Sequence, residues 1–191
     1  MFGSVRSRSA ARVWLGSILW ALARIWVGWQ FLDAGLAKIG APAWTGARAG
    51  AQIRQLLGTA SSAKMTGGPH ATVLGPYAWA IRHLFLPEAA PLAYMVTAAE
   101  VGIGAALILG LCTRAAAAGG ACLNLLYLLA GSVGVNPLML SIELAIALVG
   151  TTAGLIGVDA FLQPALRRRS GPRGQLDRTR NGTEGRLRRA S

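Results

Sequence analysis

The chain has 191 residues and a formal net charge of +12, yet only 14% of its residues are charged. A soluble domain carries about 25% charged residues, and four apolar stretches of about twenty residues, each enough to cross a membrane as a helix, exclude a soluble fold here. The basic residues gather at the two ends of the chain instead of covering a folded soluble surface, which excludes a nucleic-acid-binding domain.

The apolar stretches predict four transmembrane helices. A basic N-terminus of residues 1–12 precedes the first helix, over residues 13–38, and a long loop of residues 39–91 follows it. Three further helices are predicted over residues 92–111, 115–134 and 138–161. Because only about three residues join these last helices, they must be antiparallel neighbours. We therefore predict an all-α membrane protein whose domain, residues 13–161, is a four-helix bundle in up-down-up-down order.

The long loop contains two amphipathic segments. Residues 46–57 place Ile53 and Leu57 on one helical face, and residues 76–87 do the same with Tyr77 and Phe85. Such segments lie in the headgroup layer of a membrane more readily than they cross it. We expect interfacial helices here, which act either as a lid over the mouth of the bundle or as a passive anchor.

The distribution of basic residues predicts the orientation of the chain. Residues 162–191 hold nine arginines and lack any apolar period, as is typical of a disordered tail. The side with both termini receives thirteen basic residues in all, against four on the side of the long loop. Basic residues mark the cytoplasmic side of a membrane. Both termini are therefore expected in the cytoplasm, and the loop outside it, in a multi-pass protein.

Small residues at four-residue spacing predict where the helices touch. Close helix packing in lipid uses small side chains, because lipid offers no hydrophobic reward for association. The expected packing positions are Gly102, Ala106 and Gly110 on the second helix and Gly150 and Gly154 on the fourth.

Ionisable residues within apolar stretches are candidates for function, because each is costly in a membrane unless paired or hydrated. Counted from the predicted helix ends, Arg24, Glu100 and Asn124 lie at a similar depth. An interior ion pair between Arg24 and Glu100 follows, which either fixes the register of the bundle or forms a pocket for an anion or a quinone head group. Glu143 lies nearer the outer face without a basic partner, which favours protonation or hydration.

Other cofactor sites are not expected. Both histidines, His70 and His83, lie in the loop, so no pair of helix histidines can ligate a haem. The sequence has no cluster of metal ligands and no nucleotide-binding glycine motif. A redox role would therefore use a diffusible lipid-soluble cofactor or a partner subunit.

The order of several short motifs resembles the DoxX/DoxD family of small membrane proteins. The motifs begin with Arg24, the run Gly28-Trp29-Gln30-Phe31-Leu32-Asp33-Ala34-Gly35, Lys38 and Trp44; they continue with Glu100 and Gly104, with Gly120, Asn124 and Tyr127, and with Asn136-Pro137 and Gly157-Val158-Asp159. The resemblance implies a four-helix subunit of the kind found in thiosulfate:quinone oxidoreductase, in a bacterial plasma membrane.

The leading hypothesis is a quinone-linked oxidoreductase subunit with no haem, metal or nucleotide of its own. Arg24 would stabilise negative charge and Glu100 would orient the head group or relay protons as the catalytic residues. The pocket would be completed by Gln30 and Trp44 at the entrance and by Asn124 and Glu143. A second redox subunit or a soluble redox protein would be its partner. The alternatives are a non-enzymatic membrane scaffold for such a protein, or a pathway for a small solute or protons.

Overall fold

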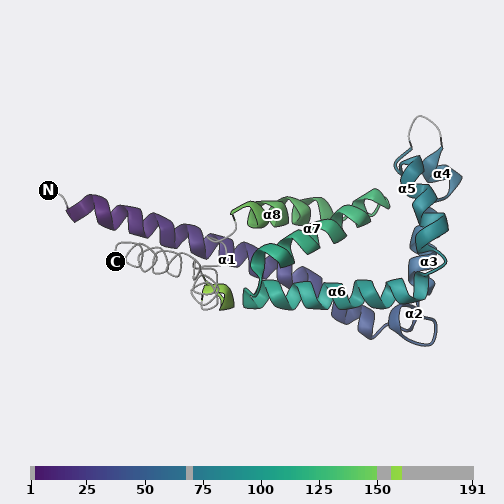
Figure 1. Cartoon of the computed structure of the whole chain (residues 1–191), viewed down its shortest axis with the longest axis horizontal. Helices are drawn as coiled ribbons and strands as arrows, with labels where there is room; N and C mark the ends of the chain where they lie inside the picture. The colour runs from purple at the N-terminus through teal and green to yellow at the C-terminus, as the bar shows by residue number, and fades with distance from the viewer. Residues whose placement is uncertain (1–2, 68–70, 150–155, 161–191) are drawn as a thin grey trace, which may run out of the picture. The chain divides into compact units, whose positions relative to one another are not determined.

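The computed structural model describes residues 3–67, 71–149 and 156–160, and within them every regular element is a helix. The chain divides into two compact units, Met1–Asp159 and Ala160–Ser191, and the fold described below is that of the first unit (Figure 1). The predicted disordered tail lies outside the described residues. The elements are α1 (Gly3–Ile39), α2 (Pro42–Thr45), α3 (Ala51–Ala60), α4 (Ala63–Thr66), α5 (Gly75–Ala80), the π-helix η1 (Ile81–Phe85), α6 (Ala89–Leu109), α7 (Thr113–Leu129) and α8 (Asn136–Val149).

Glycines set the closest contact in the fold, between α1 and α6. These two helices pack along each other more extensively than any other pair (Figure 1). A Cβ atom added to Gly104 would lie 2.7 Å from the backbone oxygen of Gly28 and 2.6 Å from the backbone nitrogen of Leu32. A Cβ atom on Gly35 would lie 3.0 Å from the nitrogen of Val101. The backbones therefore meet where side chains are absent, and this contact fixes the axial register of α1 against α6.

The predicted small-residue seam on α6 is wrong at its centre. Gly102 is exposed and an added Cβ there meets no atom within 4 Å. Gly104, two residues on and therefore on another face of the helix, makes the contact instead. Ala106 packs against the buried cluster around Leu107, and Gly110 ends α6 in a left-handed conformation. Gly150 and Gly154 lie outside the described residues.

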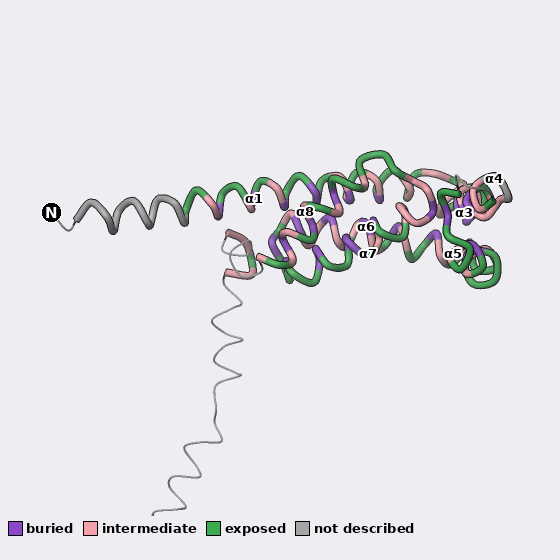
Figure 2. The backbone as a smooth tube through the Cα atoms, turned by 90° about the horizontal axis from the view of Figure 1, so that it is seen from above, coloured by how far each residue is buried: buried purple, intermediate pink, exposed green. Residues whose placement is uncertain are grey.

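The core between the long helices is shared by α1, α6, α7 and α8. Buried side chains from all four helices meet there: Val27, Phe31, Leu107, Ala116, Ala117, Met139 and Ile146. Figure 2 shows that the buried positions follow the facing sides of these helices, while their outer sides are exposed. The exposed sides carry large apolar residues such as Leu22, Leu125 and Leu148, as expected of a surface that faces lipid. The up-down-up-down transmembrane arrangement stays a prediction.

A second apolar cluster joins the loop helices to the start of α6. Ile53, Leu57 and Ile81 are buried in it together with Ala89 and Ala93 of α6. The two amphipathic loop segments therefore form helices, as predicted, and α3 and η1 pack against each other. Their apolar faces cover the end of the long helices where residues 40–88 connect α1 to α6, which we call the loop end. An interfacial position in a membrane stays a prediction.

Two helix ends differ from the sequence-based expectation. The first helix begins at Gly3 instead of residue 13, so it is about 55 Å long, well beyond one membrane thickness. The fourth helix was expected to run unbroken to residue 161, but residues 156–157 form a bend, with Gly157 at a φ of 152°. Backbone hydrogen bonding to the α6–α7 turn replaces helix there, since Asp159 N donates to Gly110 O at 2.9 Å.

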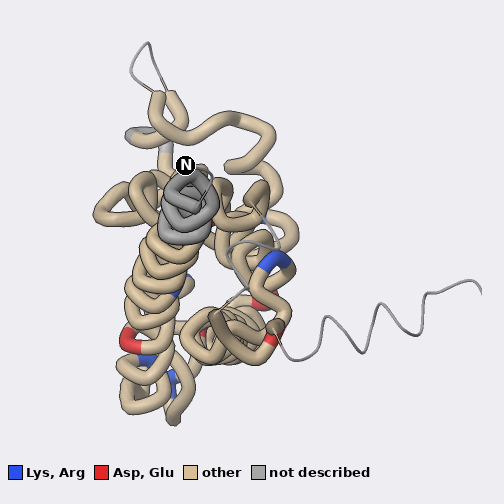
Figure 3. Tube along the Cα trace, turned by 90° about the vertical axis from the view of Figure 1, so that its left-hand side faces the viewer, with Lys and Arg blue, Asp and Glu red and all other residues tan. Residues whose placement is uncertain are grey.

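Length and composition identify the helices that could cross a membrane. In the described part of the chain these are Trp14–Ile39 and Ala89–Leu109, and Asn136–Val149 is a shorter apolar helix. Acidic and basic residues are sparse along the described helices (Figure 3). The few that are buried inside the fold are therefore the natural place to look for chemistry.

Candidate functional site

Glu100 forms a hydrogen-bonded triad with one residue from each of two other helices. Its Oε2 atom lies 2.6 Å from Lys38 Nζ of α1, and its Oε1 atom accepts a hydrogen bond from the Tyr127 hydroxyl of α7 at 2.8 Å. Glu100 itself is only 2% exposed. Each carboxylate oxygen thus has its own donor, and the ammonium group balances the buried charge. The Lys38–Glu100–Tyr127 triad ties α1, α6 and α7 together at one level.

The Arg24–Glu100 ion pair expected from the sequence is wrong. The Arg24 guanidinium lies against Gly110, where an added Cβ would be 2.5 Å from Nη1, and it donates from Nη2 to Ile156 O at 2.7 Å. Gly110 is ten residues beyond Glu100 on α6, or about 15 Å of helix. The predicted depth of Arg24 was counted from residue 13 as the start of the first helix, which in fact begins at Gly3. The true register follows from the Gly28–Gly104 contact, which sets Arg24 beside the end of α6.

Arg24 instead belongs to a polar group that closes the α6–α7 turn. The Asp159 carboxylate accepts hydrogen bonds from the backbone nitrogens of Cys112, at 2.7 Å, and Thr113, at 2.8 Å. These are orphan donors at the start of α7, where a negative charge is favourable. The negative charge of the Asp159 carboxylate also attracts the Arg24 guanidinium. Asp159 therefore caps α7 from a distant part of the chain.

We expect Asp159→Ala to lower the stability of the folded protein by about 1–2 kcal/mol, the usual effect of losing a helix cap. The apparent Tm in detergent measures this effect. Asp33→Ala is the matched control, because Asp33 is an exposed acidic residue on α1. Equal Tm values for the two variants would contradict a capping role for Asp159.

Glu143 and Asn124 form a separate buried pair. Asn124 Nδ2 donates to both carboxyl oxygens of Glu143, at 3.0 and 2.9 Å. Glu143 is fully buried and Asn124 is 1% exposed. Gly120, one turn before Asn124, leaves the necessary room, since an added Cβ would lie 2.7 Å from Glu143 Oε1. Asn124, expected beside Arg24 and Glu100, therefore serves Glu143 instead.

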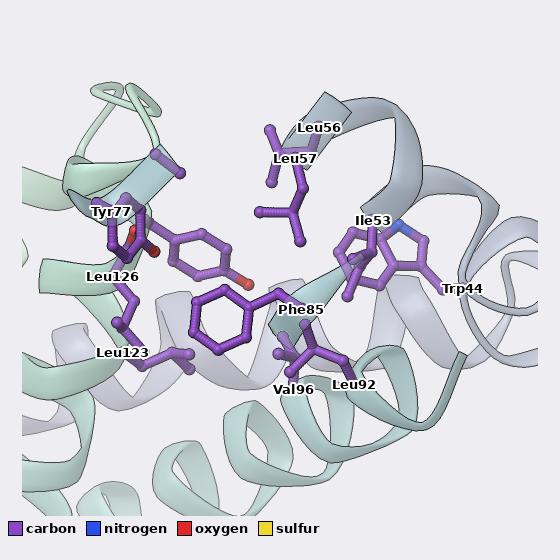
Figure 4. A pocket seen from close by; sticks show the side chains of 12 residues that line it. Trp44, Ile53, Leu56, Leu57, Tyr77, Phe85, Leu92, Val96, Leu123 and Leu126 are labelled. Atoms are coloured by element: carbon purple, nitrogen blue, oxygen red, sulfur yellow. The ribbon is translucent and has the colours of Figure 1, made fainter. Parts of the chain in front are cut away.

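An apolar cavity of about 80 Å³ lies at the loop end, beside the triad. Figure 4 shows Phe85 of η1 among its lining side chains, with Leu123 and Leu126 to one side and Trp44 and Ile53 to the other. Tyr127 also lines it, and Lys38 Nζ lies 4.9 Å from the centre of the Trp44 ring. Almost the whole wall is apolar, so the triad supplies the polar chemistry at its edge.

Loop residues form part of the cavity wall and contact α7. Tyr77 of α5 donates its hydroxyl to Leu126 O at 3.0 Å and packs edge to face with Phe85, with ring centres 6.2 Å apart. Burial raises the pKa of Tyr77, so its hydroxyl stays neutral and keeps donating. Five residues of η1 form a π-helix, a feature often found at functional sites. In the described residues, this hydrogen bond and this ring contact join α5 to the cavity wall.

The structure thus separates the predicted site residues into three groups. Trp44 lines the cavity and Glu100 is bonded to its lining residue Tyr127. Asn124 and Glu143 form the pair on α7 and α8, and Arg24 closes the α6–α7 turn. Gln30 is half-buried on α1 and does not line the cavity beside Trp44. In the described residues, no three His, Cys, Asp or Glu side chains gather closely enough to hold a metal ion.

Sequence reasoning missed Lys38, Tyr127 and Asp159 as interacting residues. Tyr127 follows Asn124 by three positions, so both must share one face of a helix, and this spacing could have indicated it. Lys38 ends the first apolar stretch and reaches back with its long side chain, as lysines near helix ends do. The partner of Lys38, Glu100, could be identified only from the axial register of α1 against α6.

The sequence model of the DoxX family matches residues 19–132 of the chain. This range contains the triad, the cavity-lining residues and Asn124, whereas Glu143 and Asp159 lie beyond it. No curated protein and no solved structure matches the chain.

Proposed function

Since the chain belongs to the DoxX family of membrane proteins, we propose that it is the quinone-binding membrane subunit of an oxidoreductase that oxidises thiosulfate or a related small sulfur species. A lipid-soluble quinone needs an apolar site for its ring and chain and a polar group for its oxygens. The cavity at the loop end and the Lys38–Glu100–Tyr127 triad offer these two features side by side. This juxtaposition carries the proposal.

The triad suits the proton chemistry of a quinone. Reduction to the quinol takes up two electrons and two protons, and two thiosulfate ions joined through a sulfur–sulfur bond release the two electrons. Tyr127 lines the cavity and its hydroxyl proton is already directed to Glu100. Protonation of a quinone oxygen by Tyr127 would leave a phenolate, which would be reprotonated from water with the Glu100 carboxylate as the relay. The Lys38 charge would stabilise the anionic stage of this exchange.

The cavity must widen to admit a quinone ring. Its volume of about 80 Å³ is well below the roughly 300 Å³ of a usual ligand site. The loop helices would be the part that moves. In the described residues, the hydrogen bond from Tyr77 to Leu126 O joins α5 to α7, and Phe85 of η1 lies among the lining residues. The loop helices would therefore act as a lid, and the quinone would enter by displacing Phe85.

The proposed setting is a bacterial plasma membrane, with the chain spanning it as an up-down-up-down bundle. The loop helices would lie at the outer interface and both termini in the cytoplasm, as the distribution of basic residues predicts. Exposed apolar residues on the outer sides of α1, α6, α7 and α8 fit contact with lipid. The electron-donating partner would be a second redox subunit or a soluble redox protein.

Filling the cavity is expected to weaken quinone binding. Val96 of α6 lines the cavity, and its neighbour Met95 is 68% exposed. Val96→Phe should raise the Kd for a short-chain benzoquinone at least tenfold, about 1.4 kcal/mol, whereas Met95→Phe should leave it unchanged. Ligand-induced thermal stabilisation of the purified full-length protein gives the Kd, and thiosulfate-dependent quinone reduction in membranes should follow the same order.

Two results would contradict the proposed function. One is a benzoquinone that does not stabilise the wild-type protein at any concentration. The other is equal binding and equal quinone reduction in the Val96→Phe and Met95→Phe variants, which would put any quinone elsewhere. Co-purification of a soluble redox protein without quinone reduction would favour the scaffold role instead.

A further inference from the structure

Glu143 is a buried carboxyl group outside the cavity lining and the Lys38–Glu100–Tyr127 triad. It is fully buried on α8, and its surroundings are the apolar core of Phe31, Met139 and Ile146 together with Gly120 and Asn124 of α7. Within the described residues, the two hydrogen bonds from Asn124 are the polar contacts of Glu143. An amide is a neutral donor and cannot balance a negative charge.

Within the described residues, the charged side chains of the neighbouring helices have other positions or partners, and Asp33 of α1 is exposed. On α1, Lys38 is bonded to Glu100, and Arg24 lies beside Gly110. On α6 the buried acid is Glu100 itself, and on α7 Arg114 is exposed. Burying an ionised carboxylate without a cation costs several kcal/mol or more, whereas a neutral carboxylic acid paired with an amide costs far less. Glu143 therefore holds a proton.

The buried acid is close to the triad through one face of α7. Asn124 and Tyr127 are three residues apart, so their Cβ atoms lie roughly 5–6 Å from each other on that face. Asn124 binds Glu143 of α8, and Tyr127 binds Glu100 of α6. Within the described residues, one carboxyl group has a lysine counter-ion and the other has only the amide. Two acids in opposite charge states, bonded to residues on adjacent turns of α7, form a proton donor and an acceptor.

We propose that Glu143 is the proton store of the cavity site. This inference rests on the proposed function: when Tyr127 gives its proton to the reduced quinone, Glu143 releases its own proton to restore the tyrosine. One O–H bond breaks at Glu143 and one forms at the Tyr127 oxygen, with the Glu100 carboxylate as the relay, and no electrons move in this step. Asn124 keeps the released carboxylate hydrogen-bonded until it is protonated again.

Infrared spectroscopy tests the charge state directly, without any need for a reagent to reach the buried group. The full-length protein in lipid vesicles at neutral pH should show the C=O stretch of a protonated carboxyl, which shifts on exchange into D₂O. Glu143→Gln should abolish this band, and Glu100→Gln, the matched variant at the ion-paired acid, should retain it. A wild-type protein without the band, or a band that Glu143→Gln leaves in place, would overturn the proposal.

Kinetics tests the coupling to the cavity. With thiosulfate as donor, Glu143→Gln should lower kcat for quinone reduction at least tenfold and leave KM and the benzoquinone Kd unchanged, because Glu143 lies outside the cavity lining. An unchanged kcat would overturn the proposal. If no quinone binds at all, the proposed function fails, and the proton store with it, while the infrared band still decides separately whether Glu143 is protonated.

Discussion

Gly104→Leu is expected to separate α1 from α6 and to cause a large loss of stability. An added Cβ at this position already lies 2.6 Å from the backbone nitrogen of Leu32 and 2.7 Å from Gly28 O. Backbone atoms cannot rotate away as a side chain can, so the helices must move apart. Overpacking of a core costs typically about 1–3 kcal/mol, and a clash with the backbone of α1 at both Gly28 and Leu32 puts this variant at or above the upper end. The apparent Tm in detergent should fall sharply.

The matched control is Gly102→Leu on the same helix. Gly102 has open space around an added Cβ, so the larger side chain should extend into lipid or detergent and leave the Tm close to that of the wild type. Gly104→Ala adds only a methyl group, so its Tm should lie between those of Gly104→Leu and Gly102→Leu. If Gly102→Leu proved the more damaging variant, the helix contact would follow the four-residue seam instead of Gly104.

Lys38→Met is expected to destabilise the protein by about 3–5 kcal/mol, the usual effect of leaving one member of a buried ion pair without its partner. Methionine keeps much of the length and the apolar contacts of the lysine side chain but removes the charge that Glu100 faces at 2.6 Å. The interaction of Lys38 with the Trp44 ring is lost as well. Thermal unfolding in detergent measures the total effect.

A double variant separates the charge effect from packing. Lys38→Met combined with Glu100→Gln removes both charges, and the introduced glutamine can still accept a hydrogen bond from Tyr127. Most of the lost stability should therefore return, because a neutral pair has no unbalanced charge. If the double variant were as unstable as the two single losses added together, the Lys38–Glu100 interaction would not be the source of the stability.

The sequence predicted several residues of the candidate site correctly, but it did not predict which of them interact. Arg24, Glu100, Asn124 and Glu143 stood out because charged and amide side chains are rare in apolar stretches, and all four are buried. Their partners were wrong or missing: Glu100 pairs with Lys38 instead of Arg24, and Asn124 with Glu143. The choice of partner depends on differences of one or two helical turns, and a depth count from uncertain helix ends cannot resolve them.

The sequence by itself determined the class of protein, its all-helical fold and the short helices of the loop. These properties are sums over contiguous residues: enough apolar side chains in a row, or apolar positions repeated on one face. Only the tertiary structure decided which buried polar groups meet, and that Glu100 of α6 faces a lysine while Glu143 of α8 faces an amide. The physical reason is the sliding freedom of two helices along each other, which ends only where glycines far apart in the chain let the backbones touch, as Gly28 and Gly104 do.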